Sequence, residues 1–417
     1  MQTSNFLGVI SNSVSGVPAE QPGTKPVWRK PPPEGVVEIV GTGVSSLVEL
    51  TDGSLLAENG SVSSDGGRTW SEPRSFGDGV SGNGLMHLDS GAIALTSDDR
   101  IWISRDGGDT WEGPRHIPMD TARRGLSDTI IQLSGGRLLC PRRTVLGGYH
   151  PDDGLGLPIG GAARVPECEG WGTWRGLPAS VEGEGHCPQM EIAFVYYSDD
   201  EGRTWSPFEE YGCLMGWFDF DGVANGNCGV TPCDEPSVAE TKDGRVLFFA
   251  RSTVGRILYS YSRDDAQTWS AVKPNELACS YSPPRLRRIP RTGDLICIWN
   301  QVSHTEIRRG YLRGRLSAAT SRNSGATWEN FKTLEVSAGL EDVERIPAEY
   351  PIRPVRSQNY VGTLPDDYAN IYYPNICFAA DKVYVIYSRG WLTQKGDEAR
   401  LTSERVLRIY PLDWFYQ

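Results

Sequence analysis

Two residues with complementary chemistry stand at matching positions of a repeated strand pattern. The segments Glu235–Ser237 (Glu-Pro-Ser) and Tyr373–Asn375 (Tyr-Pro-Asn) each lead into an apolar strand, a tight turn and a second strand. Superimposing the repeats places Glu235 and Tyr373 at the starts of two such strands, where we expect their side chains to face one another. A carboxylate beside a phenol lowers the barrier to removing the phenolic proton, so the pair predicts an activated tyrosine.

The strands that must hold this pair belong to a repeat with a distinctive turn. The pattern Ser-x-Asp-x-Gly-x-Thr-Trp begins at Ser63, Ser104 and Ser198, and weaker copies begin at Ser262 and Ser321. Asp and Ser side chains hydrogen-bond nearby backbone amides, and Gly supplies the positive φ of a tight turn. The Trp is a large apolar anchor. Each copy therefore predicts a structural turn between two strands, and repeats at such intervals indicate solenoids, propellers or arrays.

A second repeat consists of an inner strand, a turn and another strand, and the number of its copies gives the number of repeating units. With 48 Gly and 28 Pro, the many short strands favour an all-β propeller over helical folds. We predict a six-bladed β-propeller over residues 36–417, preceded by an arm at residues 1–35, with the strand 36–40 completing the last blade. The six inner strands are expected at residues 46–50, 85–88, 129–133, 237–241, 286–289 and 375–379.

Three long connections interrupt the repeats. They are predicted near residues 144–189, 209–231 and 336–368, and the first two are Gly-rich and polar. His186 lies in the first, and Asp219 and Asp221 lie in the second, where they alternate with aromatic residues. Long loops on a rigid scaffold are where binding specificity tends to sit.

Composition narrows the classes of partner. The net charge of −12 argues against nucleic acid and anionic membranes. No run approaches the roughly 20 apolar residues that span a bilayer. Residues 1–18 have no basic start and no apolar core, so we expect no signal peptide and a cytoplasmic protein. Nine scattered cysteines, an odd number, favour reduced thiols. No metal or cofactor is expected, and the oligomeric state stays open.

The repeated turn is identified as an Asp-box, or BNR repeat, and the chain resembles the sialidase (neuraminidase) superfamily. This resemblance implies a carbohydrate substrate, a Tyr nucleophile paired with a Glu base, an Asp acid/base and three arginines that grip the substrate carboxylate. By the same resemblance, Tyr373 is the nucleophile and Glu235 the base. Arg251 and Arg313 match the segments that hold the second and third arginines.

The first repeat departs from the superfamily pattern. Residues 43–45 read Gly-Val-Ser where the superfamily carries Arg-Ile-Pro, and only residues 58–60 separate the strands between which the acid loop normally lies. An acid must therefore come from elsewhere. The candidates for an acid or a substrate-binding group are Asp128, Asp219, Asp221 and His186.

Each site residue also has a structural interpretation. Glu235 can cap a turn, Arg251 can be a buried ion-pair partner, Arg313 can lie on an exposed basic strand, and Tyr373 can be a core tyrosine beside Tyr372. The sequence thus predicts an exo-glycosidase (a glycoside hydrolase) acting on a terminal, carboxylate-bearing sugar. The alternatives are a lyase that uses tyrosine as its base, or a non-catalytic propeller that binds carbohydrate or protein.

Overall fold

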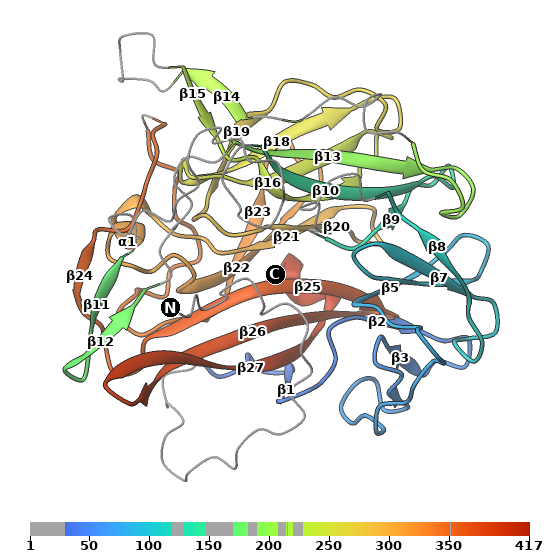
Figure 1. Cartoon of the computed structure of the whole chain (residues 1–417), viewed down its shortest axis with the longest axis horizontal. Coiled ribbons are helices and arrows are strands. Elements are labelled where there is room, and N and C mark those ends of the chain that lie inside the picture. Colours follow the sequence, from blue (N-terminus) through green and yellow to red (C-terminus); the bar gives the residue numbers. More distant parts are fainter. Residues whose placement is uncertain are drawn as a thin grey trace, which may run out of the picture.

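The computed structural model describes residues 30–118, 128–146, 170–181, 190–206, 214, 216–219, 228–350 and 352–417. In this part the chain folds into β-sheets that follow one another in chain order around a centre, from blue β2 to red β27 (Figure 1). Its helices are α1 (His304–Arg308) and a 3₁₀-helix (Leu412–Tyr416). No helix in the described ranges is long and apolar enough to cross a membrane. The predicted fold class, an all-β propeller, is confirmed.

Five sheets have the three or four antiparallel strands of a separate blade. The first two are β2 (Leu47–Glu49), β3 (Leu55–Ala57) and β4 (Val62–Ser63), then β5 (Gly84–His87), β6 (Ile93–Thr96), β7 (Arg100–Ser104) and β8 (Glu112–His116). The third is β9 (Ile131–Gln132), β10 (Leu138–Leu146) and β13 (Met190–Ser198). The others are β16 (Asp234–Glu240), β17 (Val246–Arg251), β18 (Arg256–Ser262) and β19 (Lys273–Ala278), then β20 (Arg285–Arg288), β21 (Leu295–Trp299), β22 (Arg315–Ser321) and β23 (Glu329–Val336).

The predicted count of six blades is wrong: five separate blades are joined by one wider, seven-stranded sheet. Its long strands are β25 (Ala369–Ala379), β26 (Lys382–Lys395) and β27 (Glu398–Pro411). The other four are β1 (Val37–Val40), β11 (Trp171–Trp174), β12 (Leu177–Ser180) and β24 (Tyr360–Thr363). The repeat pattern covers only the half of β25 and β26 that resembles a blade, so it missed the extension.

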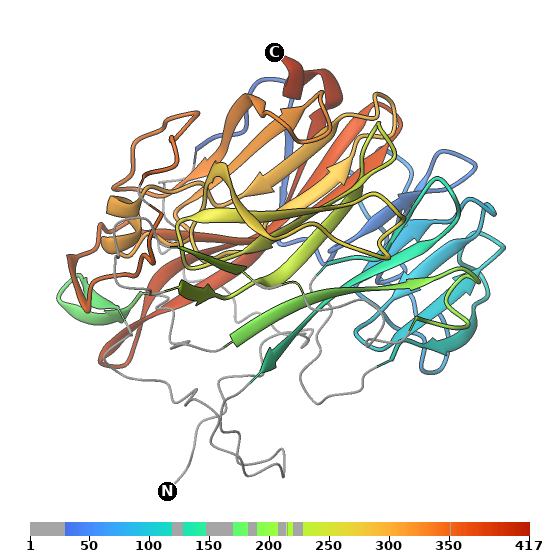
Figure 2. The ribbon, with the colours of Figure 1, turned by 90° about the horizontal axis from the view of Figure 1, so that it is seen from above.

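Parts of two predicted insertions build that extension. The hairpin β11–β12 comes from the first insertion and β24 from the third, and β11 pairs with β24 in parallel. β12 in turn pairs with β27 at Ala179 and Ala399. This group lies at the far end of β26 and β27, across the molecule from β2–β8 (Figures 1 and 2). Within the second insertion, β14 (Gly216–Asp219) and β15 (Cys228–Thr231) form a separate two-stranded ribbon.

The ring is closed by contacts between the first blade and the wide sheet. Leu47 and Leu55 pack with Tyr384 and Leu407 in one buried apolar cluster. The strand β1 pairs antiparallel with β27 along its whole length, as predicted for the N-terminal strand. Burying these apolar side chains between sheets is the main favourable term that holds one blade to the next.

The repeated turns have the predicted hydrogen bonds. In the copy between β7 and β8, Gly108 N donates to Ser104 Oγ (2.8 Å) and Thr110 N donates to Asp106 Oδ1 (2.9 Å). The hydrogen bond from the Thr110 hydroxyl is the first of several that hold the pKa of Asp106 at about 2. The turns at Ser63, Ser198, Ser262 and Ser321 have the same contacts. Each follows the last or next-to-last strand of a blade, away from the inner strands.

Candidate active site

The backbone is bent in the same way at Glu235 and at Tyr373. Their φ angles are 43° and 51°, and each residue precedes a proline. In both inner strands, β16 and β25, the pairing register shifts at this point. Positive φ is costly for a residue with a side chain, and a residue before proline normally stays extended. Such strain collects at functional sites, so the matched bends mark both residues as candidates.

Glu235 lies in a buried cluster of two carboxylates and two arginines. Arg251 Nε donates to Asp234 Oδ2 (2.6 Å), and Arg251 Nη1 lies 3.0 Å from Glu235 Oε2. Arg143 Nη1 lies 3.1 Å from Asp234 Oδ1, and its Nη2 lies 3.9 Å from Glu235 Oε1. Glu235 Oε2 is buried and accepts no hydrogen bond of good geometry from the described residues, although Arg251 is at ion-pair distance. That oxygen is the natural acceptor for a ligand proton.

Tyr373 lies on the neighbouring side, with Arg313 over its ring. The guanidinium carbon of Arg313 is 5.1 Å from the centre of the Tyr373 ring and 5.9 Å from that of Tyr372. Both Arg251 and Arg313 act on the buried thiol of Cys279, whose pKa burial raises to about 12 against their charges. The structure thus has Glu235 against Arg251 and Tyr373 against Arg313, and both arginines act on Cys279. We call these two pairs, with Arg143 and Asp234, the inner-strand site.

Asp128 lies in a separate, fully buried ion pair that ties the inner strands together. Arg287 donates to both of its oxygens (2.6 and 2.7 Å), and Arg285 Nη1 lies 3.4 Å away. The Ser237 hydroxyl also donates to Asp128, and Arg285 Nε donates to Pro374 O (2.8 Å). Burial opposes ionisation, but the two arginines outweigh it and hold the pKa of Asp128 at about 2. Asp128 is thus ionised and cannot deliver a proton near neutral pH.

The structure says less about the other three candidates for the acid, Asp219, Asp221 and His186. Asp219 ends β14, opposite Cys228. Asp221 and His186 lie outside the described residues. The sequence analysis missed the partners that complete the inner-strand site, although Asp234 is next to Glu235 and offered a signal. The missed residues are Arg143, Asp234 and Tyr281 at this site, and Arg285 and Arg287 in the separate ion pair of Asp128.

Residues 95–385 match the family model described as a BNR repeat-like domain. The chain belongs to the BNR repeat-like domain family. The predicted resemblance to sialidase-like BNR propellers is thereby confirmed. No curated protein matches the chain by sequence.

Several solved structures are similar to this BNR repeat-like protein at low identity. An α-L-arabinofuranosidase of Fusarium graminearum is 13% identical, with a TM-score of 0.47, and covers 92% of this chain and 99% of its own. A protein of unknown function from Dyadobacter fermentans is 14% identical, with a TM-score of 0.48 and coverage of 90% and 100%. A sialidase of Trypanosoma rangeli is 12% identical, with a TM-score of 0.43, over 91% of this chain and 60% of its own. These likenesses concern the fold alone.

The first blade, which precedes the matched residues 95–385, contributes a buried carboxyl group. Glu58 accepts hydrogen bonds from Ser45 N (3.0 Å) and Ser46 N (2.9 Å), and burial raises its pKa. The Arg405 guanidinium interacts electrostatically with both Glu58 and Tyr372. Glu58 therefore binds the backbone amides just before β2, and its carboxyl group lies near the positive charge of Arg405 beside Tyr372.

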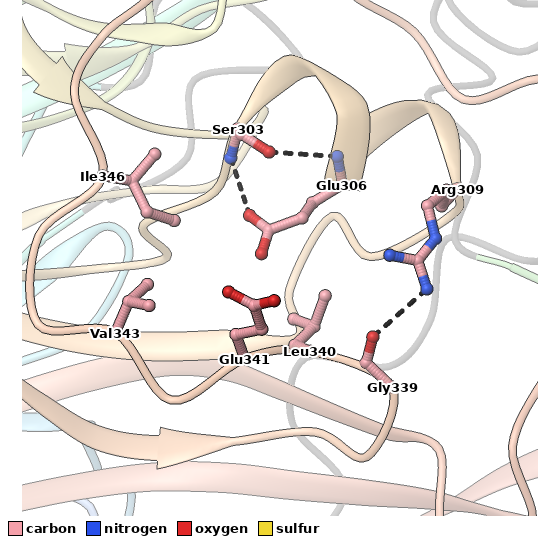
Figure 3. Close-up of a pocket in the computed structure, with 8 residues that line it drawn as sticks. All are labelled: Ser303, Glu306, Arg309, Gly339, Leu340, Glu341, Val343 and Ile346. Atoms are coloured by element: carbon pink, nitrogen blue, oxygen red, sulfur yellow. Dashed lines mark hydrogen bonds between the residues drawn. The ribbon is translucent and has the colours of Figure 1, made fainter.

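A hollow of about 460 Å³ lies beside α1, lined by residues around Glu306 and by the loop at 339–346 (Figure 3). Glu306 faces this hollow but is already engaged, because Ser303 N donates to its Oε2 (2.8 Å) and Arg315 Nη2 to its Oε1 (2.8 Å). Arg309 donates to Gly339 O across its rim (Figure 3). These contacts fix α1 against the loop, so we assign the hollow a structural role.

The first residue of α1, His304, is buried and sensitive to protons. Its Nδ1 lies 3.3 Å from Glu349 Oε2, and neither ring nitrogen makes a hydrogen bond with a described residue. Burial is the main cause that lowers its pKa below the ordinary 6.5, while Glu349 alone opposes the shift. The positive groups that add to the lowering are Arg353, Arg308 and Arg256.

We expect His304 to make the fold less stable in mild acid. Because its pKa is lower in the folded chain, the unfolded chain binds the proton first as pH falls below 6.5. The free energy of unfolding should then fall by at most about 1.4 kcal/mol per pH unit, until the folded pKa is passed. Urea titrations from pH 7.5 to 5 should show a flatter profile for His304→Leu. The exposed His116→Leu is the control, and equal profiles for wild type and His304→Leu would contradict the assignment.

Proposed function

We propose that this protein is a glycoside hydrolase that releases a terminal sugar, with Tyr373 as nucleophile and Glu235 as its base. The observation that carries the proposal is the matched pair of strained bends, which present a carboxylate and a phenol from equivalent points of β16 and β25. Arg251 and Arg313 flank the pair. In this proposal the five repeated turns are Asp-boxes that serve only the scaffold.

The proposed reaction has two steps. Glu235 accepts the phenolic proton as the Tyr373 oxygen bonds to the anomeric carbon, and the glycosidic oxygen leaves with a proton from an acid. The acid, which has lost its proton in the first step, then acts as a base and deprotonates a water molecule. This water attacks the anomeric carbon and breaks its bond to the Tyr373 oxygen, and Glu235 returns the proton to that oxygen. Asp219, Asp221 and His186 are the proposed sources of that acid, since Asp128 is held ionised.

A second candidate is a sugar-binding propeller without catalysis. It is favoured by one observation: all three guanidinium nitrogens of Arg251 already face protein carboxylates. A lyase in which Tyr373 removes a proton from the sugar would use the same pair and differ only in its product.

The test is hydrolysis of a panel of aryl glycosides that includes neutral sugars, uronic acids and N-acetylneuraminic acid. Release of the aryl group with a saturated sugar product supports the hydrolase, whereas an unsaturated sugar product identifies a lyase. Binding of glycans without turnover of any member would replace the enzyme by the binding propeller.

A further inference from the structure

Asp234 fills the position where the arginines of the inner-strand site would otherwise bind an anion from solution. Arg251 reaches Asp234 Oδ2 through Nε (2.6 Å) and Nη2, and Arg143 Nη1 lies 3.1 Å from Oδ1. The Tyr281 hydroxyl donates to Oδ2 (3.1 Å). Asp234 is fully buried. Arg251 contacts one oxygen of Asp234 through two nitrogens, and Arg143 and Tyr281 add two further donors. Such donors are what a protein offers a bound carboxylate, and here the chain supplies the carboxylate itself.

Arg251 has little left to offer a substrate. Its third nitrogen, Nη1, lies 3.0 Å from Glu235 Oε2, and the Tyr281 ring covers one face at 4.0 Å. The two arginines 143 and 251 face the two carboxylates 234 and 235, so the cluster carries no net charge (two positive, two negative). A further carboxylate brought into this buried cluster would be repelled by Asp234 and Glu235. The two arginines already balance those two carboxylates, so the cluster has no excess positive charge to offset the repulsion.

Among the described residues, two arginines of β20 are engaged elsewhere. Arg285 and Arg287 hold Asp128. Arg313 lies over the rings of Tyr373 and Tyr372. A sugar acid at the tyrosines would meet Arg313, with Arg405 also acting on Tyr372, whereas Arg143 and Arg251 already face protein carboxylates.

We propose that Asp234 is a built-in occupant of the anion position and that the inner-strand site takes an uncharged sugar. The uncharged sugar rests on the proposed function, whereas the occupancy of the arginine pair by Asp234 does not. The two parts are therefore tested separately.

The occupancy is tested with acetate, which matches the side chain that Asp234→Gly removes. Acetate should bind Asp234→Gly saturably, at least about tenfold tighter than it binds wild type, and raise its Tm. Acetamide, which has the same shape but no charge, should not. The control is Asp243→Gly, which removes an exposed carboxylate from the same sheet and should gain no acetate binding. A folded Asp234→Gly that binds no acetate, or a wild type that binds it equally well, would overturn the occupancy.

The substrate class is tested on wild type with pairs that differ only at C6, such as methyl β-D-glucoside and methyl β-D-glucuronide, and the matching galactose pair. We expect the neutral member of a pair to bind at least about tenfold tighter in calorimetry. Tighter binding of the acid member overturns the proposal and needs no variant, so it decides even if Asp234→Gly does not fold. Binding of no member counts against the uncharged sugar and against the proposed function, while the acetate result still decides the role of Asp234.

Discussion

Tyr373→Phe is expected to lower kcat by about 1000-fold or more on any glycoside that the wild-type protein hydrolyses, with little change in KM. Phenylalanine keeps the ring over which Arg313 lies but removes the oxygen that would bond to the sugar. Binding of the substrate should therefore survive while the chemical step does not. Initial rates over a range of substrate concentrations separate the two parameters.

Tyr372→Phe is the matched control for that loss. Its ring centre lies 5.9 Å from that of Tyr373, and Arg313 lies over both rings. Removing its hydroxyl should change kcat by less than about tenfold, because Tyr372 does not share the strained bend of Tyr373. A large loss in Tyr372→Phe with a near-normal Tyr373→Phe would move the nucleophile to Tyr372. Near wild-type kcat in both variants would show that neither tyrosine is the nucleophile.

Arg408→Met is expected to lower the free energy of unfolding by about 3–5 kcal/mol. Arg408 Nη2 lies 2.7 Å from Glu38 on β1 and 3.0 Å from Glu335 on β23. Arg408 and Glu335 are fully buried, and burial raises the pKa of Glu335. Methionine fills similar space without charge, so Glu38 and Glu335 would lose a shared positive partner, while Arg389 beside them also pairs with Glu404.

Denaturant titration measures this loss, and the same strand offers a control. Arg400 is exposed on β27, and its Nη2 lies 3.2 Å from a carboxylate oxygen of exposed Glu398. Arg400→Met should stay within about 0.5 kcal/mol of wild type, because exposed ion pairs contribute little. If Arg408→Met were no more destabilising than Arg400→Met, the buried cluster would not be what fastens β1 and β23 to the wide sheet.

The local repeats in the sequence predicted many strands of the blades. They did not predict the wide sheet that joins the blades. The inner strand predicted at residues 286–289 lies within one residue of β20, Arg285–Arg288, because a turn and a repeated pattern define it locally. The register of Glu235 with Tyr373 followed from the same kind of comparison. The extension of β25–β27 was missed because it depends on pairing with β11, β12 and β24, which the chain brings from distant insertions. Such long-range pairing leaves no periodic signal in the sequence.

The inner-strand site shows the same limit at the scale of side chains. Sequence reasoning placed Arg251 beside an anionic substrate or, as an alternative, in a buried ion pair, and the structure has the ion pair. What could not be predicted is that Arg143, from another blade, meets Asp234, the same carboxylate that pairs with Arg251. Asp128 was considered as an acid because of its position, yet its charge is set by Arg285 and Arg287, which lie on another blade.

The pairing of β1 with β27 also constrains the order in which this chain can fold during synthesis. β1 ends at Val40, and its partner strand runs to Pro411, so the earliest strand waits for almost the whole chain to leave the ribosome. Until then the backbone donors and acceptors that β1 directs at β27 lack these native partners, and Glu38 lacks its contact with Arg408. Contacts that close so large a loop form late and slowly, and unpaired strand edges invite association with other chains. A nascent chain stalled before β27 should therefore depend on chaperones, whereas a finished one should not.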